Sequence, residues 1–129
     1  MRVQAYVCLV SLLLASCASE VEVTEPCRVL GDVHADELPG WLEDGCYRSW
    51  DAESGVLQAT KSDGHAQVFI NPLLSESLTD GNETHPVGSA AVRVMYLEDQ
   101  ETVWGYALSV KMNKGEAADW FWFEHFGHH

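Results

Sequence analysis

The sequence predicts an α+β domain, built as an antiparallel β meander of four to five strands with one or two short helices packed on one face. Three observations predict this fold class. Throughout the second half of the chain, β-prone segments are joined by short polar connections. An Asn-Pro pair directly follows the first β-prone segment and is typical of a helix start. Before that segment, acidic residues, Gly, Pro and aromatics are mixed, which favours turns and a short helix.

Four segments account for the predicted strands. Residues 67–70, 90–97, 102–112 and 120–123 are rich in β-branched, long apolar and aromatic residues, many of which pack well on a pleated surface. The last segment is apolar on both faces, so the core must cover one face and a helix, a partner or a cofactor the other. The residues expected to be buried are Phe69, Val92, Val94, Trp104, Leu108, Val110, Trp120 and Trp122.

Two helical segments are expected. Asn71 is placed as an N-cap and Pro72 as the first helical residue, a combination that begins a helix well. The Asp-Gly-Asn cluster at 80–82 should end this helix, whose apolar face would consist of Leu73, Leu74 and Leu78. A shorter helical turn or two is expected near residues 41–50.

The N-terminal residues are typical of a secretory signal peptide. Arg2 gives a positive start, and residues 3–14 form an apolar stretch too short to span a bilayer. The Leu-Ala-Ser-Cys sequence that ends at Cys17 resembles the bacterial lipobox, in which the cysteine is acylated, for example with palmitate, and becomes the new N-terminus. We therefore expect residues 1–16 to be cleaved and Cys17 to anchor the protein in a membrane. The alternative is an ordinary cleaved signal with an incidental cysteine.

The resemblance to the lipobox also implies a location. Ala18 stands where an aspartate would favour retention in the inner membrane, so the implied address is the outer membrane, facing the periplasm. Residues 17–26 are polar and acidic and read as a tether, which leaves 27–129 as a single domain. The formal net charge of −13 disfavours nucleic acid and anionic headgroups as direct partners. The protein is therefore expected to bind the membrane through its lipid rather than through its own surface.

Two cysteines remain in the predicted domain. Cys8 lies in the signal peptide, whereas Cys27 and Cys46 form an even pair in a chain sent to an oxidising compartment. A disulfide between them closes a loop of about 20 residues and contributes on the order of 3 kcal/mol in the chain-entropy model. Metal ligation is the competing interpretation, but neither cysteine has a partner at zinc-motif spacing. The sequence therefore favours a structural disulfide.

An ordered set of short elements resembles the cytochrome P-460 family, including its relative cytochrome c′-beta. The elements are Trp50, residues 67–72 and 85–92, the Val110-Lys111 pair and the Trp-Phe-Trp triplet at 120–122. The resemblance covers about residues 46–126. It implies a small periplasmic haem c protein with a mostly antiparallel β fold, often a homodimer, that oxidises hydroxylamine or binds nitric oxide and related small ligands.

The chain departs from this family where the haem should be attached. In the family a Cys-x-x-Cys-His motif follows the aromatic strand, but residues 124–129 contain no cysteine, and Cys27 and Cys46 are far apart without a following histidine. The lysine that cross-links to the macrocycle in the P-460 members is matched by Arg93, or less closely by Lys111, and an arginine stays protonated. The residues present support no cofactor. The domain has either lost its haem or is cut short before a downstream haem c segment.

No catalytic set emerges from the remaining residues. His34 and His65 lie in polar contexts and are expected to be solvated, and His85 precedes a proline in a turn. His125, His128 and His129 are spaced to hold a metal, but they lack the outer groups that orient ligands. We assign no catalytic, cofactor-binding or metal residues.

The expected function follows from these assignments. The chain reads as a membrane-anchored envelope lipoprotein whose domain is a non-catalytic module for an unidentified small-molecule ligand or partner. The alternative is a haem c protein with redox, nitric-oxide or hydroxylamine chemistry whose attachment segment lies beyond this chain, so enzymatic activity stays open.

Overall fold

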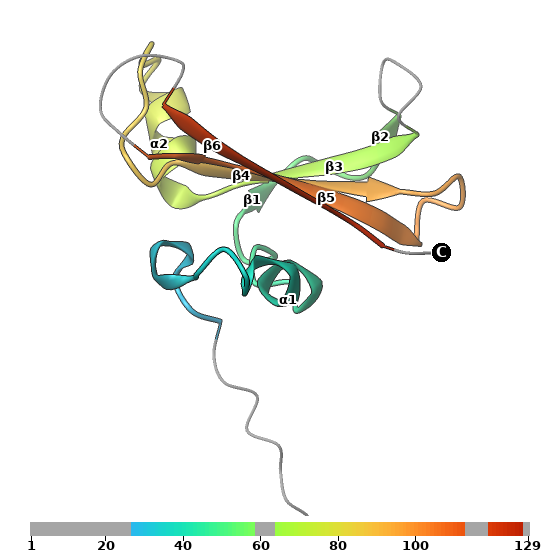
Figure 1. The fold of residues 1–129 in the computed structure, drawn as a ribbon. Coiled ribbons are helices and arrows are strands. Elements are labelled where there is room, and N and C mark those ends of the chain that lie inside the picture. The colour runs from blue at the N-terminus through green and yellow to red at the C-terminus, as the bar shows by residue number, and fades with distance from the viewer. Residues whose placement is uncertain (1–26, 59–63, 113–118, 128–129) are drawn as a thin grey trace, which may run out of the picture.

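The fold is an α+β arrangement dominated by one antiparallel sheet, as a computed structural model of residues 27–58, 64–112 and 119–127 shows (Figure 1). The strand order is β1-β3-β4-β5-β6, with β2 also paired to β3. The predicted class is therefore confirmed, although the described part of the sheet has six strands where four to five were expected. The strands are β1 (Asp51–Ala52), β2 (Leu57–Gln58), β3 (His65–Ile70), β4 (Ala90–Tyr96), β5 (Val103–Lys111) and β6 (Trp120–Phe126).

The four predicted strand segments are confirmed as β3, β4, β5 and β6. They follow one another as a meander, each antiparallel to the last. β6 runs three residues beyond the predicted end because it pairs with β5 along its whole length, from Lys111↔Trp120 to Gly105↔Phe126. The two extra strands, β1 and β2, are only two residues long and leave no periodic pattern in the sequence.

The helix predicted after β3 is confirmed as α2 (Pro72–Thr79). The Asn71 side chain accepts hydrogen bonds from the N–H groups of Leu74 (3.1 Å) and Ala90 (3.0 Å), so this N-cap also fixes the helix to the start of β4. The predicted apolar face is only partly right. Leu74 is buried, but Leu73 and Leu78 are exposed and Ser77 lies inward, because α2 stands at one end of the sheet and has a narrow contact with it (Figure 1).

The earlier helix begins sooner than predicted. α1 (Leu38–Glu43) carries a proline in its first turn and is followed by turns up to residue 49, whereas the sequence pointed to residues 41–50. A 3₁₀ turn, η1 (Leu30–Asp32), precedes it. Both segments lie on the same side of the sheet, below it in Figure 1.

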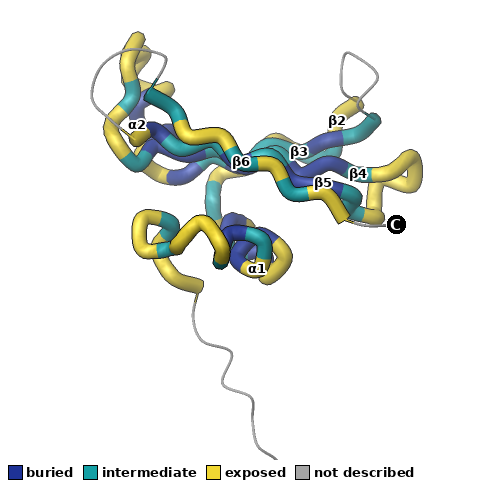
Figure 2. The backbone as a smooth tube through the Cα atoms, in the orientation of Figure 1, coloured by how far each residue is buried: buried dark blue, intermediate teal, exposed yellow. Residues whose placement is uncertain are grey.

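The hydrophobic core lies between α1 and the sheet, where buried residues of both meet (Figure 2). Of the residues predicted to be buried, Phe69, Val92, Val94 and Leu108 are, whereas Trp104, Val110 and Trp120 are half-buried. The prediction for Trp122 is wrong, since this side chain is 71% exposed on the opposite face. The core also contains residues that strand periodicity did not reveal: Leu38, Trp41, Leu42, Tyr47 and Tyr106.

The two cysteines of the domain meet beside this layer. The sulfur atoms of Cys27 and Cys46 lie 2.07 Å apart and their Cα atoms 5.3 Å apart, which is disulfide distance. The signal peptide, Cys17 and the tether all lie outside the described residues. Within residues 27–58, 64–112 and 119–127, no helix has both the length and the apolar character needed to cross a membrane.

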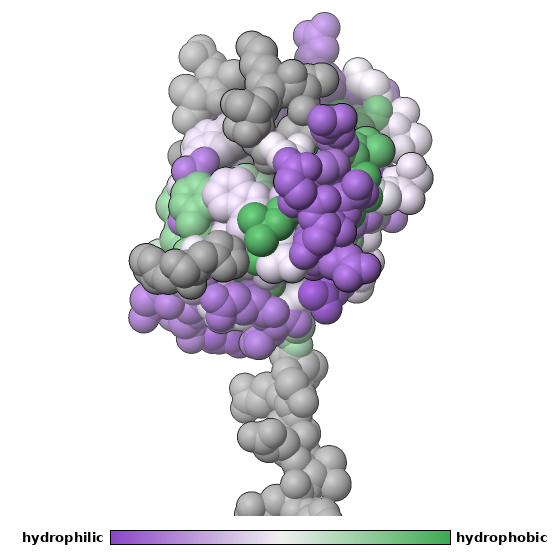
Figure 3. Space-filling view, turned by 90° about the vertical axis from the view of Figure 1, so that its right-hand side faces the viewer, coloured by the Kyte–Doolittle hydropathy of each residue, from purple (hydrophilic) through white to green (hydrophobic). Residues whose placement is uncertain are grey.

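The surface of one flank is mixed in character. On the side seen in Figure 3, hydrophilic residues gather in two groups, and smaller hydrophobic areas lie between them. Apolar surface is thus broken up on this flank.

Candidate functional site

The two faces of the sheet are covered differently. α1 and η1 lie over one face, and α2 stands at the end of the sheet, so these elements leave the middle of the other face open (Figure 1). Because side chains alternate along a strand, each strand contributes every second residue to this open face. The open face is where the structure places Trp122.

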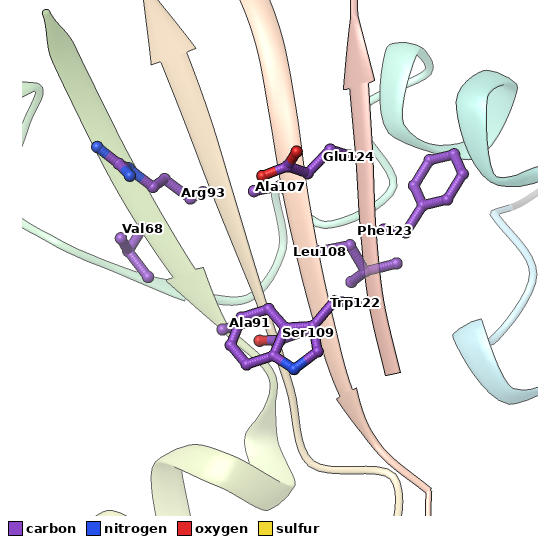
Figure 4. Close-up of a pocket in the computed structure, with 9 residues that line it drawn as sticks. All are labelled: Val68, Ala91, Arg93, Ala107, Leu108, Ser109, Trp122, Phe123 and Glu124. Carbon is purple, nitrogen blue, oxygen red and sulfur yellow. The ribbon is translucent and has the colours of Figure 1, made fainter. Parts of the chain in front are cut away.

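Strand register arranges the open face in rows. One row runs Val68, Arg93, Ala107 and Glu124, and the next runs Ile70, Ala91, Ser109 and Trp122. In the first row Ala107 therefore lies between Arg93 and Glu124. In the second row Ala91 and Ser109 lie between the larger Ile70 and Trp122. The result is a pocket of about 560 Å³, called the open-face pocket below. It is lined by Val68, Ala91, Arg93, Ala107, Leu108, Ser109, Trp122, Phe123 and Glu124 (Figure 4).

The pocket presents one aromatic ring and two charged groups. In Figure 4 the Glu124 carboxylate points over Ala107, and the Trp122 indole extends toward Ala91 and Ser109. Arg93 stands on the other side of Ala107, with its guanidinium directed toward β3. This arrangement offers a surface for stacking with polar groups at its margin.

Arg93 and Lys111, the two residues that the sequence resemblance singled out, both lie on the open face. Arg93 lines the pocket. Lys111 lies in an outer row opposite Trp120, is 3% exposed, and has its ammonium nitrogen 5.8 Å from the centre of the Trp120 ring. That cation–π contact accounts for part of the environment of a buried charge.

The described histidines are separated from one another. His85 Nδ1 lies 2.9 Å from Ser77 Oγ, but Ser77 is 2% exposed and cannot meet a substrate. His125 stacks on Tyr106 and bonds the Glu43 carboxylate at 2.8 Å. The expectation of a solvated His65 is wrong, because it is half-buried in β3 and its Nδ1 has no hydrogen-bond partner among the described residues.

His125 is the one member of the C-terminal histidine group that lies within the described residues. His128 and His129, two of the three histidines weighed as a metal cluster, lie outside the described residues. Within the described residues, no group of three His, Cys, Asp or Glu side chains is arranged to hold a metal ion.

The sequence did not single out three tyrosines that lie in the hydrophobic core or pack against it. Burial raises the pKa of the Tyr47, Tyr96 and Tyr106 hydroxyls above the ordinary tyrosine value. Tyr47 packs its ring edge-on against Phe69, with centroids 4.8 Å apart. With raised pKa values these hydroxyls stay protonated at neutral pH, which fits a role in the core rather than in acid–base chemistry.

The described residues do not fit covalent haem c. Thioether attachment needs two thiols next to a histidine, and the two described cysteines lie at disulfide distance from each other instead. Neither has a histidine beside it in the sequence. We therefore derive no chemistry through a haem.

The comparisons with known proteins add no assignment. No family model, no curated protein and no solved structure matches the chain.

Proposed function

We propose that this chain is a lipid-anchored protein of the bacterial envelope whose single P-460-like domain is a non-catalytic binding module. The open-face pocket is its small-molecule site. The observation that carries this proposal is a pocket floored by small side chains beside an indole that is 71% exposed.

The exposed indole supports binding on energetic grounds. A tryptophan side chain buries ~150–250 Å² when it is covered. Covering the exposed part of Trp122 would then contribute about 3 kcal/mol to ligand binding, at ~25 cal/mol per Å². Folding alone leaves this contribution unused, since α1 and η1 pack on the other face.

The pocket's size and chemistry indicate the ligand class. Its volume of about 560 Å³ lies in the range of small-molecule sites. A flat aromatic molecule would stack on Trp122 and lie over Ala107 and Ser109. The resemblance supports the same place, since Arg93, which matches the macrocycle-linked lysine, lines the pocket.

The anchor explains how such a module is presented. A lipid on Cys17 and the acidic tether 17–26 would hold the domain at the outer membrane, facing the periplasm. Ten extended residues reach at most about 35 Å. The net charge of −13 repels anionic headgroups, which favours a domain that stands off the surface.

A fluorescent aromatic probe tests the pocket. The full-length protein, purified in detergent, should enhance the emission of the uncharged probe N-phenyl-1-naphthylamine above the emission in the same detergent without protein. Trp122→Ala and Ala107→Leu should abolish most of this enhancement, the first by removing the stacking ring and the second by filling the floor. Leu78→Ala, which removes another exposed side chain (51% exposed) away from the pocket, is the matched control. Equal enhancement in all four proteins would refute the pocket assignment.

An absorption spectrum of the protein from its native host separates the two functions that the sequence left open. A spectrum without a Soret band supports the binding module. A Soret band with a pyridine haemochrome of haem c would overturn it in favour of the haem protein.

Metabolic labelling tests the anchor. Radiolabelled palmitate should enter the wild-type protein and not the Cys17→Ala variant, which lacks the acylated thiol. Equal label in both proteins would exclude lipidation at Cys17.

A further inference from the structure

The two edges of the sheet are finished differently. At one edge, β1 and β2 both pair with β3. Glu53 adds to this cover, because its carboxylate accepts the Val68 N–H at 2.9 Å and its own N–H donates to the Val68 carbonyl at 3.1 Å. At the other edge, β6 is the last strand of the described sheet.

The hydrogen-bond pattern shows which backbone groups β6 presents outward. Met112 N–H donates to Asp119 O and Gly127 N–H donates to Trp104 O, each at 2.9 Å. Bonded and non-bonded pairs alternate along an antiparallel ladder, so the odd-numbered residues of β6 bond to β5. The N–H and C=O groups that point away from β5 therefore belong to Trp120, Trp122, Glu124 and Phe126.

β6 lacks the features that usually block an edge strand. Exposed edges are commonly short, interrupted by proline or bulges, or protected by lysine. β6 is seven residues long and contains no proline, lysine or arginine. Its exposed apolar side chains are Phe121 (36%), Trp122 (71%) and Phe126 (43%).

We propose that the outer edge of β6 binds an extended, basic segment of another protein as an added strand. This proposal rests on the proposed role of the domain as a binding module, but it uses the backbone of the edge rather than the pocket floor. Main-chain hydrogen bonds would supply the affinity, and alternate side chains of the segment would supply the specificity.

The negative charge of Glu124 and of the whole chain indicates that the partner segment is basic. Glu124 lies at the centre of the outward-facing residues, beside the exposed Trp122 indole. A lysine or arginine on the added strand can pair with the carboxylate and contact the indole face. The chain carries a formal charge of −13, which attracts a basic segment. A second copy would instead bring the same acidic edge and the same net charge.

Peptide binding to the full-length protein in detergent tests this inference. The probe is an eight-residue peptide of alternating lysine and valine, measured by calorimetry at low salt. A glutamate–valine peptide should not bind. The lysine–valine peptide with every backbone nitrogen methylated keeps its charge but loses the donors of both edges, so its affinity should fall about tenfold or more. Equal affinity of the methylated and unmethylated peptides would reduce the interaction to charge alone and overturn the proposal.

Two variants at one position locate the binding edge. Glu124→Pro removes an outward N–H and the carboxylate, but no bond to β5, which is where an edge strand tolerates proline. It should abolish peptide binding, whereas Glu124→Gln, which keeps the backbone donor, should weaken it only several-fold. If Glu124→Pro fails to fold, the methylated peptide decides the question.

Further outcomes separate this inference from the pocket and from self-association. Ala107→Leu should abolish probe binding in the pocket. It displaces only the Glu124 carboxylate that lies over Ala107, so it should weaken peptide binding no further than Glu124→Gln does, and the two proposals can fail independently. Unchanged peptide binding by a folded Glu124→Pro protein would overturn the edge assignment. A wild-type dimer that Glu124→Pro converts to a monomer would make a second copy the occupant and would likewise overturn it.

Discussion

The covered and open faces of the sheet differ in the size of their side chains. The covered face carries Phe69, Val92 and Leu108, whose side chains fill the core under α1. On the open face the neighbouring positions of β4 and β5 are Ala91, Ala107 and Ser109. At these three positions the strands leave space on the open face, beside the larger Arg93 of β4, while their core-facing neighbours fill the other side. The pocket therefore removes nothing from the core.

The strand β6 differs from β4 and β5, because it carries large aromatic side chains on both faces. Phe123 packs against the core from one face, while Trp122 remains exposed on the other. A large side chain without cover contributes little to folding, so its presence next to small residues points to binding. The comparison of the two faces therefore predicts which aromatic residues stabilise the domain and which stay exposed without contributing to its stability.

Two tryptophans give the sharpest contrast. Trp41 is 7% exposed and its indole N–H donates to the Arg28 carbonyl at 2.9 Å. Trp41→Ala should lower the free energy of unfolding by about 3–5 kcal/mol, whereas Trp122→Ala should change it by about 0.5 kcal/mol or less. Urea denaturation of both variants measures the difference. Equal losses would mean that the open face is covered in solution.

Loss of the disulfide should destabilise the layer that η1 and α1 form over one face of the sheet, and should leave the open face unchanged. Replacing Cys27 and Cys46 together by serine should lower the free energy of unfolding by about 3 kcal/mol, because the unfolded chain regains the freedom of the closed loop. Probe binding at the open-face pocket should persist in the folded fraction, since the disulfide lies outside the pocket lining. Loss of pocket binding in a variant that is still folded would contradict this separation of the two faces.

The β3 edge of the sheet, which β1, β2 and Glu53 cover, allows a test with a smaller expected effect. Glu53→Ala removes the carboxylate that accepts the Val68 N–H. We expect a loss of about 1 kcal/mol in unfolding free energy, as for a typical intramolecular hydrogen bond, and thermal melts should detect it. Glu124→Gln, at the unprotected edge, is the control that should leave stability unchanged. A larger loss from Glu124→Gln than from Glu53→Ala would reverse our assignment of the two edges.

The smallest predicted effect is a dependence of stability on alkaline pH. Burial raises the pKa of the Tyr47 hydroxyl above the ordinary tyrosine value of 10.0, so the folded state holds this proton more tightly than the unfolded state does. The resulting stabilisation is complete below pH ~10 and is lost as pH rises through the folded pKa. Urea denaturation across this range should show a fall that is less steep in Tyr47→Phe. An unchanged slope would assign the dependence to Tyr96 and Tyr106.

The sequence predicted the fold well where periodicity and capping act locally. The β-prone segments and the Asn71 cap gave β3 to β6 and α2. Local patterns failed where tertiary packing decides. β1 and β2 exist only because they meet β3, and the sequence Trp-Phe-Trp-Phe does not reveal which face of β6 is covered.

The candidate site was harder to predict than the fold. Arg93 was singled out by the family resemblance alone, and Glu124 was one acid among many in a chain with 20 of them. A usable signal was present along β5, where Ala107 and Ser109 alternate with the larger Leu108 and Val110. Ala91 on β4 gives no such pattern, because it follows another alanine. That alternation predicts a face without bulk, but register was needed to bring these residues together.

The disulfide also decides how mechanical load would enter the domain. In the proposed lipid-anchored form, the protein is pulled from its N-terminal side, and Cys27 is the first described residue that such a pull reaches. The disulfide would pass the force directly to Cys46, so residues 28–45, including α1, would bear none of it. Reduction of the bond would put these residues in series with the tether and let them extend by up to about 60 Å. The disulfide would therefore limit how far the domain can move from the membrane, in addition to stabilising the fold.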